Sequence, residues 1–351
     1  MVWRDRVPAR VGYGVPSVPP VANCGSVGLI LPTTQWGVFP GKYGNTTGTN
    51  RGTTPGITEA LIRTCREAEA AGAGALWAVD HLFWPGPMLE CLTTLTVAAT
   101  ATRTAALGTC VLQLPLRRPA AVAKQAAALQ LLSGGRFVLG VGAGSHPGEY
   151  LMAGADFGGR GRQLDRGLDE LRRAWASAGD PDLAYRQEPA AAPVPVWVGG
   201  SSDAARRRAA RAGDGWVPMF LGPERLGAAL GQLRDDTVAA GRPAGAVTAA
   251  VVAMVAVGRD RGVGARGAGW LSSLYGIPPK AFDRHLVAGP AEHCAEQVHR
   301  FFEAGADHVV VMVADDRAVD HFAELVGALS PARPGPAAPA PARPELVEVP
   351  A

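Results

Sequence analysis

Residues 103–150 read RTAALGTCVLQLPLRRPAAVAKQAAALQLLSGGRFVLGVGAGSHPGEY, and this stretch decides the fold of the chain. Ala105–Leu112 is a short apolar run without charge, which predicts a buried strand. Ala120–Leu132 is rich in Ala, Leu, Lys and Gln, which favours a helix, and Ser133-Gly134-Gly135 ends it. Phe137–Val141 predicts a second buried strand. Two parallel strands joined by a helix form a βαβ unit, whose crossover is right-handed.

The same alternation of strand-like and helix-like segments continues on both sides of this unit. Strands are predicted at Val27–Leu31, Ala75–Val79, Ala105–Leu112, Phe137–Val141, Val194–Val198, Gly215–Met219, Val247–Val257 and His308–Val313. Helices are predicted at Ile57–Ala71, Leu89–Ala101, Ala120–Leu132, Arg162–Ala176, Asp203–Ala212, Pro223–Ala240, Pro290–Ala304 and Val319–Leu329. Eight strands, nearly all followed by helices, predict a single (β/α)8 TIM barrel rather than an open sheet. Gly258–Leu286 is too long for a simple connection and is predicted to form an inserted lid with a short helix.

The composition supports one large domain with irregular ends. A barrel of this kind needs about 250 residues, and the chain has 351, of which 47% are hydrophobic. We expect the barrel over residues 27–329. Residues 1–26 are rich in Pro, Gly and Val without periodicity and predict an irregular arm. Residues 330–351 are mostly Pro and Ala and predict a disordered tail.

The remaining global features exclude several classes of protein. A net charge of +3 with 19% charged residues gives no indication of a nucleic-acid surface. The sequence has no run of about 18 apolar residues and no apolar leader segment, so we expect a cytoplasmic protein without a membrane span. Its five cysteines are scattered and form no CxxC pair, which indicates reduced thiols and argues against a structural zinc site.

The carboxyl ends of the predicted strands are where a barrel of this type carries its active site. Asp80 and His81 follow the second strand, and an imidazole can give or take a proton near neutral pH. Phe83 and Trp84 follow directly and suggest a pocket with aromatic walls. His81 is therefore the candidate acid/base, with Asp80 as an orienting or coenzyme-contacting residue. The alternative is an ordinary structural or exposed histidine.

Two glycine-rich segments also follow predicted strands. Gly140-Val-Gly142-Ala-Gly144 would let a ligand approach bare backbone. It lacks the third glycine of a dinucleotide fingerprint, and Pro147-Gly148 predicts that no helix begins directly after it. Gly199-Gly200-Ser201-Ser202 precedes a predicted helix, whose free N–H groups and dipole favour a phosphate. The alternative is a plain turn with a serine cap.

Aromatic residues lie in the two segments expected to flank the mouth of the barrel, residues 33–56 and 258–286. They are Trp36, Phe39, Tyr43, Trp270 and Tyr275. Together with Trp84 they are candidates to shape the pocket of an apolar organic substrate. Packing alone is the competing explanation.

These residues resemble the luciferase-like flavin and deazaflavin oxidoreductases, and within them the branch that uses coenzyme F420. The resemblance covers residues 27–329. The matching segments are Gly28-Leu29-Ile30-Leu31-Pro32, Asp80-His81, Gly108-Thr109-Cys110-Val111, Leu116-Arg117-Arg118-Pro119-Ala120, Ala123-Lys124-Gln125, Leu132-Ser133-Gly134-Gly135-Arg136, Leu139-Gly140-Val141-Gly142-Ala143-Gly144, Val198-Gly199-Gly200-Ser201 and Ala212-Gly213-Asp214-Gly215-Trp216.

The resemblance implies a hydride transfer between reduced F420 and a small organic substrate, with the coenzyme supplying the redox chemistry. It places His81 near the face of the ring that exchanges hydride, and Cys110-Val111 at a bulge with a non-proline cis peptide behind the ring. The resemblance implies that the first glycine-rich loop packs against the ring and that Gly199-Gly200-Ser201 binds the coenzyme phosphate. It also implies a homodimer. The coenzyme-binding residues expected on this basis are Cys110, Val111, Gly142, Ala143, Gly144, Ser145, Gly199, Gly200 and Ser201.

One position departs from some relatives, and other functions remain open. Ser145 stands where enzymes that oxidise sugar phosphates carry a carboxylate, with Glu149 four residues on, which argues against that substrate class. A monooxygenase that uses reduced FMN is the main alternative, and an inactive flavin-binding relative or partner subunit is another. A metal-dependent hydrolase is disfavoured, because the histidines form neither HxH nor HExxH, and we expect no metal site.

Overall fold

The computed structural model describes residues 26–33 and 56–329, which form a closed parallel β-barrel surrounded by helices. The strands are β1 (Ser26–Ile30), β2 (Ala75–Ala78), β3 (Ala106–Thr109), β4 (Leu112–Gln113), β5 (Phe137–Gly142), β6 (Val196–Gly199), β7 (Gly215–Val217), β8 (Thr248–Val257), β9 (Leu286–Gly289) and β10 (His308–Val313). The order β1-β2-β3-β5-β6-β7-β8-β10 closes through pairing of β10 with β1. The TIM barrel predicted from the sequence is confirmed.

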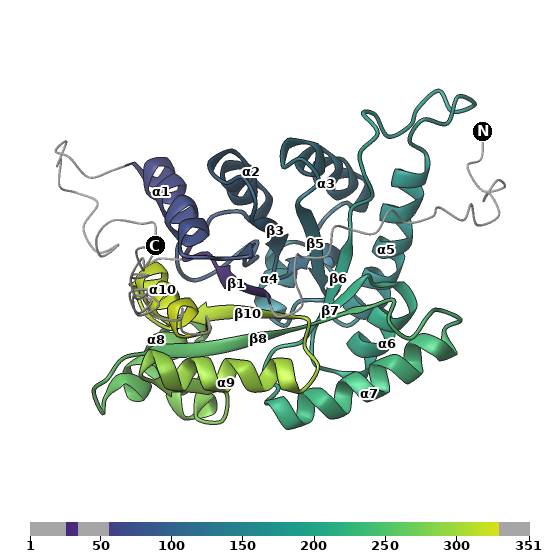
Figure 1. Ribbon diagram of the computed structural model, residues 1–351. Coiled ribbons are helices and arrows are strands. Elements are labelled where there is room, and N and C mark those ends of the chain that lie inside the picture. Colours follow the sequence, from purple (N-terminus) through teal and green to yellow (C-terminus); the bar gives the residue numbers. More distant parts are fainter. Residues whose placement is uncertain (1–25, 34–55, 330–351) are drawn as a thin grey trace, which may run out of the picture.

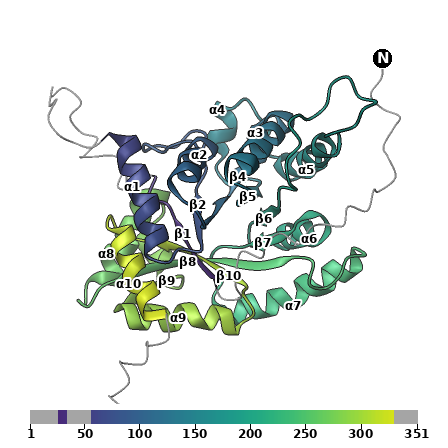
Figure 2. The same cartoon turned by 45° about the horizontal axis from the view of Figure 1, so that its top comes forward.

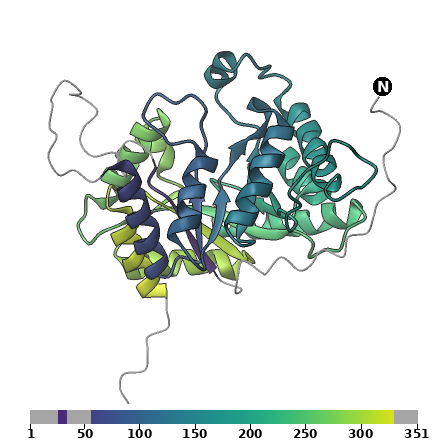
Figure 3. The same ribbon diagram turned by 90° about the horizontal axis from the view of Figure 1, so that it is seen from above.

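Most of the helices surround the barrel in chain order (Figure 1, Figure 2). They are α1 (Ile57–Ala70), α2 (Cys91–Ala101), α3 (Pro119–Leu132), α4 (Pro147–Met152), α5 (Arg160–Ala176), α6 (Asp203–Ala212), α7 (Pro223–Ala239), α8 (Val263–Tyr275), α9 (Ala291–Glu303) and α10 (Ala318–Leu329), with short 3-10 turns η1 (Leu114–Leu116) and η2 (Pro279–Phe282). Seen from above, α1, α2 and α3 run side by side (Figure 3). No helix within the described residues is long and apolar enough to cross a membrane.

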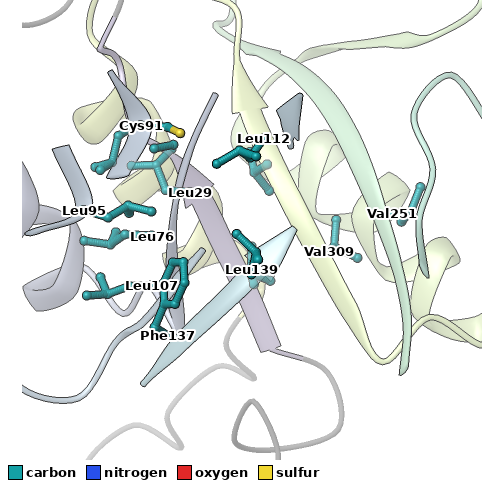
Figure 4. Packing of buried hydrophobic residues seen from close by; sticks show 14 of the residues in the cluster. Leu29, Leu76, Cys91, Leu95, Leu107, Leu112, Phe137, Leu139, Val251 and Val309 are labelled. Atoms are coloured by element: carbon teal, nitrogen blue, oxygen red, sulfur yellow. The ribbon is translucent and has the colours of Figure 1, made fainter. Parts of the chain in front are cut away.

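Alternation along the strands divides the core into two clusters, because successive side chains of a strand point to opposite faces. On β5, Phe137, Leu139 and Val141 belong to the outer cluster between the strands and the helices, where Leu95 of α2 also lies (Figure 4). Val138, the residue between two of them, belongs to the cluster inside the barrel. By the same alternation Gly140 and Gly142 face inward, where the Thr109 carbonyl and the Val111 side chain take up the room that a Cβ atom would need.

Large rings fill the other end of the barrel interior. Trp77 of β2 and Trp197 of β6 are fully buried with ring centroids 5.1 Å apart. A Cβ atom at Gly28 would lie 2.5 Å from the Trp77 ring, and one at Gly108 would lie 2.1 Å from it. Glycine on the neighbouring strands is therefore what makes room for this tryptophan inside a small barrel. The amino-terminal end is closed by packing, and this leaves the carboxyl end for a ligand.

The segment expected as a lid is more regular than predicted. Its helix α8 has 13 residues rather than being short, and Leu286–Gly289 forms the extra strand β9 beside β8. The sequence did not predict the full length of α8 because its glycines have a low helix propensity. One of them, Gly267, lies so close to β8 that a Cβ atom would come within 2.6 Å of the Ala256 side chain. β9 is only four residues long, and an apolar run of that length does not identify a strand.

Two further predictions were wrong in detail. The strand expected to reach Met219 ends at Val217, and Met219 makes a single parallel bridge to Val252. Pro218 lacks the N–H that would extend the ladder, and Phe220 turns the chain with a φ of 63°. A helix does begin directly after the first glycine loop, at Pro147. Proline suits the first position of a helix because its missing N–H is not needed there.

Candidate active site

The ends of β3, β5 and β6 meet around one side chain, Val111. The peptide bond between Cys110 and Val111 is cis, in agreement with the expectation from the resemblance. A Cβ atom on Gly142 would lie 2.6 Å from Val111, and one on Gly199 would lie 2.8 Å from it. The two glycine loops predicted from the sequence are therefore adjacent in space, with Val111 between them.

Burial makes Cys110 unreactive. Desolvation raises the pKa of its thiol to about 12, so the thiol stays protonated at neutral pH. Ala143 follows Gly142 at the end of β5, and its carbonyl accepts a hydrogen bond from the Tyr150 hydroxyl. Gly144 follows with a φ of 70°, and Ser145 is exposed at the start of the turn into α4. The Tyr150 hydroxyl thus holds the loop through the Ala143 carbonyl, while Ser145 stays exposed.

His81 lies on the same rim, connected to the first glycine loop through Gln113. Gln113 pairs with Gly142 in the β4–β5 register. Its side-chain nitrogen lies 3.4 Å from His81 Nδ1, and its Oε1 lies 2.1 Å from where a Cβ atom of Gly144 would be. Gln113 therefore packs between the imidazole and the glycine loop. No sequence pattern singled out this residue, and its importance follows from its position directly after Val111 and Leu112.

Glu149 is the direct partner of His81. Its Oε2 lies 2.8 Å from His81 Nδ1, and its carboxylate also accepts hydrogen bonds from the Gln113 side chain at 3.1 and 3.2 Å and from the Phe83 N–H at 3.3 Å. Desolvation raises the pKa of Glu149, but the His81 partner and these donors outweigh it and hold the pKa below its ordinary value. The glutamate is 3% exposed, so the pair is shielded from water on the carboxylate side.

Short helix α4 is what brings Glu149 to His81. The helix begins at Pro147, and Glu149 is its third residue. The sequence showed Glu149 near the glycine loop. Because no helix was predicted there, the direction of the Glu149 side chain toward His81 could not be predicted. The spacing Pro147-x-Glu149 after a loop was the signal available, since proline and acidic residues are both favoured in a first helical turn.

Asp80 is held away from His81 by an arginine. Both of its oxygens bind Arg117, at 2.7 and 2.8 Å, and Oδ2 also accepts the Gln113 N–H at 2.8 Å. The side chain is 4% exposed. Asp80, Glu90 and Cys91 have ligand atoms within 4.8 Å of one another, a spacing that suits a metal ion. The Arg117 guanidinium already supplies the positive charge to Asp80, and desolvation raises the pKa of the Cys91 thiol well above its ordinary value.

Aromatic rings cover one face of His81. The Trp84 ring lies 3.8 Å from the His81 ring between centroids, tilted by 32°. His146, which precedes α4, stands edge-on to Trp84 at 4.8 Å and lies 5.5 Å from His81. Burial, followed by the nearby His81, lowers the pKa of His146. The aromatic wall predicted from Phe83 and Trp84 is thus made by Trp84 and by a histidine that the sequence had not indicated.

The second glycine loop has its expected position at a helix start. Ser202 caps α6 by accepting the Ala205 N–H at 3.2 Å, and Gly200 has a φ of 110°. The Ser201 hydroxyl bonds the backbone of Met219, which ties this loop to the end of β7. Gly200, Ser201 and Ser202 are exposed. No hydrogen bond or ring contact in the described part of the chain joins this loop directly to His81.

The predicted substrate-pocket residues are only partly assembled. Trp36 and Phe39 lie outside the described residues. Tyr275 ends α8 and packs on the cluster inside the barrel, where burial, followed by the nearby Cys110, raises the pKa of its hydroxyl. Trp270, on the same helix, donates to Asp316 at 3.0 Å. Trp84 follows β2, whereas Trp270 and Tyr275 both belong to α8.

Comparison with known proteins agrees with this fold. Residues 43–263 match the model of the luciferase-like monooxygenase family. The chain belongs to this family.

Curated relatives match this chain over part of their length. A Mycobacterium tuberculosis phthiodiolone/phenolphthiodiolone dimycocerosates ketoreductase is 29% identical over 202 residues, which are 52% of each protein. The chain spans about half the length of the curated relatives it matches, from 47% to 52%.

Solved structures share the fold at low identity. An F420-dependent secondary alcohol dehydrogenase in complex with an F420-acetone adduct superposes with a TM-score of 0.70 at 19% identity, over 87% of this chain and 99% of that one. The monooxygenase RslO1 from Streptomyces bottropensis gives a TM-score of 0.67 at 20% identity, over 87% of this chain and 98% of that one.

Proposed function

We propose that this protein transfers a hydride between coenzyme F420 and the carbonyl or alcohol carbon of a small organic substrate, with His81 as the acid/base. The observation that carries the proposal is the position of the imidazole on the same rim as the inward-facing glycines, joined to them through Gln113. The ketoreductase relative and the F420-dependent alcohol dehydrogenase are both described by a carbonyl–alcohol reaction. That reaction requires a group able to move a proton at oxygen.

The residues at the rim fit a polar, ring-shaped coenzyme. Two side-chain oxygens at strand ends, Thr33 Oγ1 and Gln113 Oε1, are buried without a hydrogen-bond partner in the described chain. Buried polar atoms of this kind cost free energy until a partner arrives. Cys110-Val111 would support the ring, and Gly142, Ala143, Gly144 and Ser145 would lie against it. Gly199, Gly200 and Ser201, with the free N–H groups of α6, would hold its phosphate.

In this assignment the bound coenzyme supplies the hydride, and the protein supplies the proton. Reduction of a carbonyl adds a hydride to carbon and a proton to oxygen. His81 Nε2 has no hydrogen-bond partner within the described residues, so it is the atom able to give that proton and to take it back in alcohol oxidation. Trp84, Trp270 and Tyr275 would exclude water from the substrate. Asp80, neutralised by Arg117, would orient Gln113 rather than exchange protons.

A reduced-FMN-dependent monooxygenase is the second candidate function. It is favoured by the family to which the chain belongs and by the similarity to RslO1. The two coenzymes differ in reactivity with oxygen, since reduced FMN traps it readily and the deazaflavin does not. The glycine loops would serve either coenzyme, so the choice depends on measurement.

The test is a parallel titration of the apoprotein with reduced F420 and reduced FMN without oxygen, followed by admission of air. We expect tighter binding of F420 and no rapid reoxidation in air. Tight binding of FMN alone, with fast oxygen consumption, would replace the first candidate by the second. Binding of neither coenzyme would reject both. Light scattering of the same sample tests the predicted homodimer.

A further inference from the structure

We propose that Glu149 is the positioning residue for His81: it fixes the imidazole with its proton on Nδ1 and provides the counter-charge when Nε2 also becomes protonated. This inference rests on the proposed function of His81 as acid/base. Neither the sequence patterns nor the similarity to other proteins assigns a role to Glu149. Its contacts in the folded protein do.

The tautomer follows from the chemistry of the partners. An ionised carboxylate can only accept hydrogen bonds, so Glu149 Oε2, 2.8 Å from Nδ1, requires the proton on Nδ1. The carboxylate is fixed by the Gln113 side chain and by the Phe83 N–H. Trp84 stacks 3.8 Å from the imidazole and restricts rotation of its ring. These contacts hold the imidazole in one orientation. In the neutral ring, Nε2 is therefore the nitrogen that can accept a proton.

The charge balance around the two buried carboxylates supports the same role. Asp80 is neutralised by the two-pronged contact with Arg117. Glu149 is as deeply buried, and the cation that pairs with it among the described residues is His81 in its protonated form. Other titratable groups near the pair among the described residues include His146, whose ring lies 5.5 Å from His81, and Tyr150, which interacts electrostatically with Glu149. A buried carboxylate without a cation is costly, so protonated His81 is the partner that balances the charge of Glu149.

This arrangement accounts for proton return after each turnover. Transfer of the Nε2 proton to a substrate oxygen forms an O–H bond and leaves neutral His81 beside Glu149, which is still negative. The unpaired charge favours uptake of a new proton from solvent, and the His81 side chain is 17% exposed, enough to receive it. No additional oxidant or reductant is needed for this step.

Nuclear magnetic resonance of the coenzyme-free protein labelled with nitrogen-15 at histidine tests the inference directly. The nitrogen shifts of His81, assigned by their loss in His81→Gln, should show a protonated Nδ1 and an unprotonated Nε2 in the neutral ring. In Glu149→Ala the proton should redistribute toward Nε2. The matched control is the exposed pair His299–Glu303, 3.7 Å apart, where Glu303→Ala should leave the His299 shifts unchanged. A proton on Nε2 of wild-type His81, or no change in Glu149→Ala, overturns the proposal.

Glu149→Gln removes the negative charge while keeping the shape of the side chain. This variant therefore tests the proposal even if Glu149→Ala does not fold. An amide oxygen can still accept from Nδ1, so the tautomer should persist while the counter-charge is lost. Carbonyl reduction should then fall by about 10- to 100-fold in kcat with little change in KM, and its alkaline decline should move to lower pH. An unchanged pH profile contradicts the counter-charge role. Because the resonance measurement needs no coenzyme, it can succeed even where the coenzyme titration rejects the proposed function.

Discussion

The two ends of the barrel each hold a histidine, and the difference between them separates a structural role from a chemical one. At the amino-terminal end His308 is 1% exposed, with Nε2 accepting the Trp77 indole N–H at 3.1 Å and Nδ1 2.7 Å from the Ser26 hydroxyl. Both ring nitrogens are satisfied by neutral partners. At the carboxyl end His81 pairs one nitrogen with a carboxylate, and the other has no partner in the described chain. The second pattern suits proton exchange.

The packing around the two histidines differs in the same way. Trp77 and Trp197 fill the interior beside His308 at centroid distances of 5.5 and 5.9 Å. Toward the carboxyl end the last residues of β5 and β6 are glycines, and a Cβ atom on Gly142 or on Gly199 would meet the small Val111 side chain. Four changes test this contrast.

Replacement of His81 should have the largest effect on activity. His81→Asn removes the acid/base, so turnover should fall by about 10²- to 10⁴-fold. The proposed coenzyme contacts are at the glycine loops and at Cys110-Val111, so coenzyme affinity should stay near that of the wild type. Steady-state rates and a coenzyme titration measure the two quantities. Wild-type turnover in this variant would show that His81 does not act as an acid/base.

Replacement of His308 should have the opposite profile. His308→Ala leaves the Trp77 N–H buried without a partner and opens a cavity, which should lower the free energy of unfolding by about 3 kcal/mol. Urea denaturation followed by tryptophan fluorescence measures this loss. Turnover per folded molecule should be unaffected. A variant as stable as the wild type would remove the structural role assigned to this end.

The acid dependence of stability should depend on His308. Burial lowers its pKa to about 3 in the folded protein, whereas an unfolded histidine titrates near 6.5. The unfolded state therefore binds the extra proton first, so stability falls as the pH drops from about 6.5 toward 3, by up to about 1.4 kcal/mol per pH unit. His308→Gln should flatten this slope. His146 and His285, whose pKa values are also lowered, remain in both proteins and cancel in the comparison. Equal slopes would contradict the assignment.

A smaller effect is expected at the second glycine loop. Gly200→Ala adds a methyl group where the phosphate is proposed to bind, at a φ of 110°, and should weaken coenzyme binding about tenfold, which is about 1.4 kcal/mol. Gly241→Ala is the control, because Gly241 also has a positive φ of 75° and its Cβ would meet open space. Both variants should lose about 1 to 2 kcal/mol of stability. If both bind coenzyme equally well, the phosphate does not lie at Gly200.

Much of the architecture was predictable because it depends on local patterns. Apolar runs with period two and amphipathic helices identified every strand that closes the barrel, and strand order then placed Asp80-His81 and the glycine loops at one end. The sequence missed β9 and understated α8, where four-residue runs and glycines carry little signal. It also missed α4, because Pro147-Gly148 suggested a loop when proline in fact began the helix.

The sequence by itself determined the barrel and the family, because these follow from the alternation of elements and from motifs a few residues long. Only the tertiary structure decided which carboxylate serves which cation. Asp80 is adjacent to His81 in the chain yet binds Arg117, whereas Glu149 is 68 residues away and binds His81. The physical reason is that ion pairs form between side chains that strand ends and helix turns bring together, and their distance along the chain does not encode that meeting.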